Sequence, residues 1–171
     1  AGPADDVVDE ITAAGGMAIA DAHDVSTEHG AAALVASAVD SFGRVDVLVN
    51  NAGIIRWADF PAADTENMER HLAVHVLGSF HTARAAWPHL VAQGYGRVVN
   101  TTSSGMFGLP NNVGYATAKA GVVGLTRSLA TAGAPHGIRC NLVAPAAFTR
   151  MAGTVDPDSP MATTMGPGHP L

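Results

Sequence analysis

The sequence predicts an α/β domain built on a doubly wound parallel sheet. Candidate strands and candidate helices alternate along the whole chain, and the candidate strands are short, almost continuous apolar runs. Strands of this kind are buried on both faces, so we expect helices on both faces of the sheet. The 171 residues fit one domain that spans residues 1–171.

The expected elements follow one another in regular order. Helical spacing of apolar residues predicts helices over 3–14, 27–42, 65–92 and 113–132. Short apolar runs predict strands over 17–22, 45–49, 97–100 and 138–144. Ser26 is expected to cap the second helix and Gly43 to end it. The residues beyond Met151 show no periodicity and are expected to form a loop.

Composition and charge exclude several classes of protein. A net charge of −6 argues against nucleic-acid binding, because no basic patch can displace phosphate counterions. The apolar runs are too short to span a membrane, and no secretory pattern opens the chain. Cys140 is the only cysteine, so an internal disulfide is impossible and a reducing, cytoplasmic location is expected. We therefore expect the partner to be a small-molecule substrate.

Polar or glycine-containing turns follow all four candidate strands. These turns begin at Asp24, Asn50, Thr101 and Pro145. The carboxyl ends of parallel strands lie along one edge of a sheet, and ligands of open α/β sheets bind in the crevice outside that edge. The sequence therefore predicts a binding site there.

Tyr115 and Lys119 are the strongest candidates for catalysis. They lie four residues apart on a predicted helix, so their side chains share one face. Lys119 is also the only lysine among nine basic residues. A phenol is normally too weak an acid for proton transfer at neutral pH, but a nearby ammonium favours its ionised form. The pair therefore predicts a proton donor and acceptor for the interconversion of a carbonyl and an alcohol.

Two other kinds of site are not expected. His71 and His75 have the spacing of two metal ligands on one helix, but no Glu lies between them in the required position. Ser103 does not lie in the Gly-x-Ser-x-Gly pattern of a hydrolase nucleophile. We therefore expect neither a metal site nor a hydrolase.

Four motifs, in order, resemble the classical short-chain dehydrogenase/reductase family. They are Asn50-Asn51-Ala52-Gly53, the hydroxyl cluster at 101–104, the Tyr115 and Lys119 pair, and the segment from Asn141 to Pro145. The resemblance implies a Rossmann-type sheet and NAD or NADP as the cofactor, with NAD favoured. It also implies hydride exchange with a ketone or secondary alcohol, and assembly as a homodimer or homotetramer.

The resemblance further implies roles for individual residues. Tyr115 would be the general acid and base, and Lys119 would stabilise its phenolate and bind the nicotinamide ribose. Thr102 is favoured by spacing, and Ser103 by residue type, as the donor of a hydrogen bond to the substrate oxygen. The other implied cofactor contacts are Asp24 and Val25 at the adenine, Asn50, Ala52 and Gly53 along the adenosine, and Pro145 and Thr149 at the nicotinamide.

The sequence departs from the family pattern at His75, which stands where the family has Asn. We expect its ring to lie near Lys119, joined to it by a water molecule, and to relay a proton. Ala146 stands where Gly is usual, and the following hydroxyl comes at Thr149. These departures resemble the (3R)-hydroxyacyl-CoA dehydrogenase domains of multifunctional enzymes. They imply a 3-hydroxyacyl thioester or another hydrophobic substrate.

A larger departure is that the sequence contains no glycine-rich phosphate loop. The resemblance begins at the family's second helix, so the first strand, first helix and second strand have no counterpart here. The last strand also has none. A dinucleotide's diphosphate needs such a loop and its helix N-terminus. We therefore expect the chain to be part of a longer oxidoreductase domain, the alternative being a non-catalytic Rossmann-like scaffold or binding module.

Overall fold

The structure is a computed structural model, and it describes residues 2–108 and 110–145. At its centre is a parallel three-stranded sheet with the strand order β1-β2-β3. The strands are β1 (Val47–Asn50), β2 (Gly96–Thr101) and β3 (Ile138–Val143). Val49 pairs with Val99, and Asn100 pairs with Leu142. The predicted parallel sheet is therefore confirmed, and these strands lie within one or two residues of their expected bounds.

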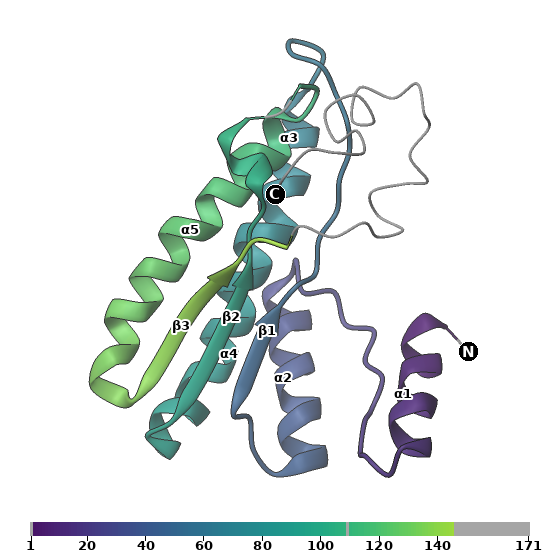
Figure 1. Cartoon of the computed structure of the whole chain (residues 1–171), viewed down its shortest axis with the longest axis vertical. Coiled ribbons are helices and arrows are strands. Elements are labelled where there is room, and N and C mark those ends of the chain that lie inside the picture. The colour runs from purple at the N-terminus through teal and green to yellow at the C-terminus, as the bar shows by residue number, and fades with distance from the viewer. Residues whose placement is uncertain (1, 109, 146–171) are drawn as a thin grey trace, which may run out of the picture.

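Helices occupy most of the remaining described chain (Figure 1). They are α1 (Pro3–Ala13), α2 (Glu28–Phe42), α3 (Thr65–His71), η1 (Leu72–Leu77), α4 (Gly78–Gln93), η2 (Ser104–Phe107), α5 (Val113–Gly133) and η3 (Ala134–His136). None of these helices combines the length and apolar character needed to span a bilayer. The cap of α2 is Thr27, whose hydroxyl accepts a bond from the Gly30 amide, and not Ser26. Asp24 accounts for this correction, because its carboxylate holds the Ser26 amide in the preceding turn.

The helices α2, α4 and α5 lie on the same side of the sheet (Figure 1). They enclose a core of small and medium apolar side chains: Val35, Ala86, Leu90, Val98, Ile138 and Cys140. We expected helices on both faces, but in the described chain Val47 and Val49 remain 55% and 59% exposed on the other face. Because both crossovers run in the same direction along the sheet and crossovers are right-handed, both connecting helices reach the same face.

The segment 17–22 is not a strand, contrary to the prediction. It is extended, and Met17 and Ile19 are 83% and 45% exposed. The apolar pattern indicates an extended chain, but a strand also requires a neighbour to share its hydrogen bonds, and no described strand pairs with this segment. Only three strand ends therefore line the edge that was expected to carry four.

The long helix expected over 65–92 is divided into three parts. The residues between α3 and α4 form the wider π-helical turn η1, which contains His75. Single π-turns within longer helices occur frequently at functional sites. The wider turn changes the directions in which the side chains around His75 point, so α-helical spacing alone does not place that ring.

Candidate active site

Tyr115 and Lys119 lie together at the carboxyl edge of the sheet, as the sequence predicted. Tyr115 is in the first turn of α5 and is half-buried, and Lys119 follows one turn later. The Lys119 ammonium lies 5.5 Å from the centre of the Tyr115 ring and donates to the Thr101 carbonyl at 2.8 Å. The end of β2 therefore fixes the lysine, and the lysine places a positive charge beside the phenol ring.

Lys119 is only 4% exposed. Burial lowers the pKa of its ammonium to about 8, because the charged form loses its hydration. The ammonium form therefore predominates at neutral pH and is lost in mildly alkaline solution. Within the described residues one of its three N–H groups donates to the Thr101 carbonyl, and two remain for a ligand.

The two candidate hydroxyls have different partners. Thr102 is 4% exposed, and its hydroxyl donates to the Lys119 carbonyl at 2.8 Å. Ser103 is half-buried, and its oxygen accepts from the Gly105 amide at 3.1 Å. A hydroxyl has only one hydrogen to donate, and Thr102 has already used its own. The Ser103 hydroxyl donates to no group in the described part of the chain, so its hydrogen remains for a substrate oxygen. The geometry therefore favours Ser103 as the donor to the substrate oxygen, as its residue type also does.

His75 lies in η1, with its ring only 5.3 Å from the Tyr115 ring in an edge-to-face arrangement. The residue is 2% exposed, and its Nε2 lies 2.9 Å from the Ile54 carbonyl oxygen. Among the residues that the structure describes, none forms a hydrogen bond with Nδ1. Burial and, second to it, the nearby Lys119 charge lower the pKa of His75 to about 4. The ring is therefore neutral at physiological pH, and the expected water between it and Lys119 stays a prediction.

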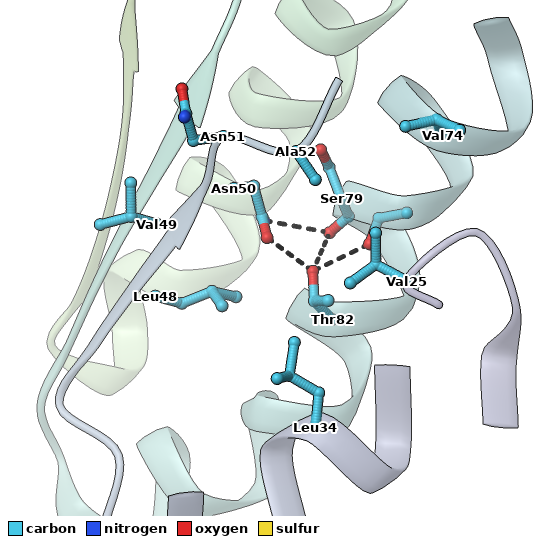
Figure 2. Close-up of a pocket in the computed structure, with 11 residues that line it drawn as sticks. Val25, Leu34, Leu48, Val49, Asn50, Asn51, Ala52, Val74, Ser79 and Thr82 are labelled. Atoms are coloured by element: carbon cyan, nitrogen blue, oxygen red, sulfur yellow. Dashed lines mark hydrogen bonds between the residues drawn. The ribbon is translucent and has the colours of Figure 1, made fainter. Parts of the chain in front are cut away.

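A hollow of ≈ 130 Å³ lies between the end of β1 and the helix α4 (Figure 2). Three of the residues expected to contact the cofactor line it, namely Val25, Asn50 and Ala52. The side chains that the sequence reasoning did not identify are Leu34, Leu48, Val49, Asn51, Val74, Ser79 and Thr82. The lining is mostly aliphatic, with amide and hydroxyl groups along one side.

Asn50 is held by a chain of buried polar groups. Its amide nitrogen donates to the Asn100 side chain at 2.8 Å. Its oxygen accepts from the Thr82 hydroxyl at 2.7 Å (Figure 2). The Asn100 amide nitrogen donates in turn to Thr126 on α5 at 2.8 Å. The sequence signal for this chain was an Asn inside a run of buried strand residues, which is rare unless the amide is bonded.

The other expected cofactor contacts are placed less directly. Asp24 is exposed and does not line the hollow, and its bonds to Ser26 lower the pKa of its carboxyl group. Gly53 lies against His75, where a Cβ would come within 2.7 Å of the ring carbon Cε1. Pro145 is exposed just beyond β3, and Thr149 lies outside the described residues.

Within the described chain, no three His, Cys, Asp or Glu residues are grouped as metal ligands.

Comparison with known proteins places this geometry among dehydrogenases. Residues 1–159 match the family model described as short chain dehydrogenase. The chain is 47% identical over 155 residues to a putative short-chain type dehydrogenase/reductase of Mycobacterium tuberculosis, covering 90% of this chain and 54% of that protein. It is 44% identical over 156 residues to the peroxisomal multifunctional enzyme type 2 of Mus musculus, covering 91% of this chain and 21% of that one.

A solved structure gives the same picture. NAD+-bound xylitol dehydrogenase matches with a TM-score of 0.79 and 33% identity, covering 83% of this chain and 55% of that chain. This likeness, together with the parallel sheet and its flanking helices, confirms the Rossmann-type fold. The chain spans about half the length of the mycobacterial relative and of the xylitol dehydrogenase.

Proposed function

The chain belongs to the short-chain dehydrogenase/reductase family of oxidoreductases, and we propose that it interconverts a secondary alcohol and a ketone with NAD or NADP. The observation that carries the proposal is the position of the buried Lys119 ammonium, 5.5 Å from the centre of the Tyr115 ring and bound to the Thr101 carbonyl at the end of β2. The Ser103 hydroxyl follows the same strand end two residues later. No observation favours the non-catalytic scaffold.

The residues present fit part of a dinucleotide. The aliphatic hollow beside Asn50 suits the flat adenine, with Val25 and Ala52 in its wall, and the two free N–H groups of Lys119 suit ribose hydroxyls. The nicotinamide, when bound, gives or takes the hydride. This sequence has no phosphate loop, so these residues account for the adenosine and ribose ends only. The likeness to an NAD+-bound enzyme supports NAD over NADP.

Each catalytic side chain has a separate task. Ser103 donates a hydrogen bond to the substrate oxygen and so fixes the carbonyl or alcohol beside Tyr115. In reduction, the Tyr115 hydroxyl gives its proton to that oxygen, and in oxidation the phenolate takes a proton from it. Lys119 stabilises the phenolate electrostatically, and this stabilisation is strong because the ammonium is buried. The neutral His75 ring packs against the phenol ring and limits its movement.

We propose a hydrophobic substrate of the 3-hydroxyacyl thioester class. The similarity to a peroxisomal multifunctional enzyme supports this class. So do three large apolar side chains, Trp57, Phe60 and Phe107, which are 51%, 81% and 83% exposed. They lie on the two segments that precede α3 and α5, and these segments are joined by the bridge between Ala58 and Asn112. An acyl chain would cover part of this apolar surface.

Assembly and location also remain proposals. Gly121 and Gly124 are exposed on α5. Leu77 at the end of η1 and Phe80 on α4 are 45% and 40% exposed. Such small and apolar surfaces suit the packing of a second subunit, as in a homodimer or homotetramer. We propose a cytoplasmic location from the single cysteine, although the similar mouse protein is named as peroxisomal.

Turnover by the full-length protein tests the proposed function. NADH and NADPH oxidation should be followed with 3-ketoacyl thioesters of several chain lengths, and with a short, polar ketone for comparison. We expect turnover that rises with acyl chain length and prefers NADH. Equal rates with the polar ketone would contradict the substrate class, and no turnover with any ketone or alcohol would contradict the reaction.

A further inference from the structure

A row of three side chains contacts the backbone of the segment 54–56, which follows β1. Asn67, His71 and His75 are spaced four residues apart along α3 and η1. The Asn67 amide donates to the Arg56 carbonyl at 3.0 Å, and His71 Nε2 accepts from the Arg56 amide at 3.2 Å. His75 Nε2 contacts the Ile54 carbonyl at 2.9 Å. The row therefore binds the backbone of this irregular segment at two alternate residues.

The spacings of the row and of the segment match. Two residues of extended chain span roughly 6.6 Å. The His71 and His75 rings are parallel within 9° and lie 6.1 Å apart. Each ring therefore faces its own peptide group, and Ile54 and Arg56 run antiparallel to the helix that holds them.

The partners of His71 define its protonation. Nδ1 lies 2.7 Å from the Asn67 carbonyl, which can only accept, so this nitrogen carries the hydrogen. Nε2 then has a lone pair for the Arg56 amide. Both nitrogens of this fully buried ring are used once each, which is the arrangement of a neutral imidazole held in one tautomer.

Two glycines show how tightly the row is enclosed. A Cβ at Gly114 would lie 2.6 Å from Asn67 Oδ1 and 2.9 Å from His71 Nδ1, and a Cβ at Gly53 would lie 2.7 Å from His75 Cε1. One glycine directly precedes the segment 54–56 and the other directly precedes Tyr115. The row therefore packs closely between the segment carrying Gly53, which is expected to contact the cofactor, and the start of α5 at Gly114.

We propose that Asn67 and His71 are positioning residues that fix the segment carrying Ala52 and Gly53 against Tyr115. This inference rests on the proposed function, because it assigns the row a part in that reaction. Neither residue needs to touch the substrate. Each acts through the Arg56 backbone, and His71 also contacts the Tyr115 ring edge-to-face at 6.2 Å. Releasing Arg56 would leave the cofactor loop free to shift relative to the phenol.

Two replacements of His71 separate the possible roles. In His71→Gln, the side-chain amide reaches the place of Nε2 and can still accept from Arg56. In His71→Asn, the amide reaches only the place of Nδ1, so the bond to Asn67 is kept and the bond to Arg56 is lost. A residue that only stabilised α3 would be rescued by Asn, whereas the positioning role is rescued by Gln.

The test combines hydrogen exchange at the Arg56 amide with kinetics on the full-length protein. We expect exchange in His71→Asn to be about tenfold faster than in the wild type and His71→Gln, with kcat/KM about tenfold lower and the dinucleotide KM raised. Asn67→Ala, at a half-buried position, should also raise that KM if His71→Asn does not fold. The inference would be overturned if His71→Asn kept the wild-type kcat/KM and His71→Gln did not. It would also be overturned if the Arg56 amide exchanged in His71→Asn at the wild-type rate. Protection of Arg56 as expected without any wild-type turnover would instead overturn the proposed function and leave the anchoring supported.

Discussion

The two ends of the candidate site are held in place by different means. At the Tyr115 end, backbone groups fix the side chains: Lys119 binds the Thr101 carbonyl, and Thr102 binds the Lys119 carbonyl. At the hollow, Val25 comes from the turn before α2, which belongs to no described strand. The difference indicates that the proton-transfer end is preorganised, whereas the adenosine end depends on packing. Substitutions at the two ends should therefore change different kinetic constants.

The largest effect is expected from Tyr115→Phe. This change removes only the phenolic oxygen and keeps the ring that packs on His75. Turnover should fall by roughly 10²–10⁴-fold, because general acid–base catalysis is lost. The dinucleotide dissociation constant, measured by NADH fluorescence, should stay within about twofold. Residual activity within tenfold of the wild type would exclude Tyr115 as the proton donor.

Ser103→Ala and Thr102→Val form a matched pair at the same end. Ser103→Ala should lower kcat by about 10²-fold, because the substrate oxygen loses a donor. Thr102→Val removes the bond to the Lys119 carbonyl and should cost about 1 kcal/mol of unfolding free energy. The kcat of Thr102→Val should change much less than that of Ser103→Ala. A larger fall in kcat for Thr102→Val than for Ser103→Ala would make Thr102 the donor, as its spacing from Tyr115 favours.

His75 should make stability depend on pH. The folded-state pKa of His75 is lowered to about 4 from 6.5, so the unfolded chain takes up this proton first as the pH falls. The free energy of unfolding should therefore fall between these two pH values, by up to about 3 kcal/mol, and stop falling on this account below them. Urea unfolding of His75→Asn should lack this loss. His89→Asn, at an exposed position on α4, is the control and should keep it.

The smallest effect is expected at the adenosine end. Val25→Ala removes two methyl groups from the wall of the hollow and should raise the dinucleotide KM by about three- to tenfold. Its kcat should be unchanged, because no group of the proton-transfer end is affected. Val7→Ala, on the exposed α1, is the control and should leave both constants alone. A fall in kcat for Val25→Ala would show that the two ends are coupled.

The sequence was sufficient where local pattern decides the structure. Runs such as 45–49 predicted strands correctly, although one face of this strand is exposed in the described chain, and the spacing of Tyr115 and Lys119 placed both on one helix face. The segment 17–22 was predicted wrongly, because a strand depends on a neighbour that may be remote in sequence. The choice between Thr102 and Ser103 depends on which hydroxyl has a backbone partner, and spacing does not contain that information.

The residues missed at the hollow and along the hydrogen-bond chain behind it share a physical reason. Thr82, which lines the hollow, and Thr126, which does not, are ordinary helix residues in sequence, and their importance comes from hydrogen bonds to Asn50 and Asn100 on the sheet. Asn100 was the visible signal, as a polar residue near the end of a predicted strand. The π-turn at His75 was also beyond the sequence pattern, because it alters helical spacing over a few residues only.

The polar chain beneath the sheet has a consequence for folding. Its hydrogens all point one way, from Thr82 through Asn50 and Asn100 to Thr126, which donates to the Val122 carbonyl. If α5 packed on the sheet in a shifted register, the Asn100 amide would be buried without its acceptor, at a cost of roughly 1–3 kcal/mol. Misaligned packing of α5 is therefore penalised at a single buried amide. Because these hydrogen bonds link α4, the sheet and α5, thermal and denaturant unfolding should show the three melting in one cooperative transition.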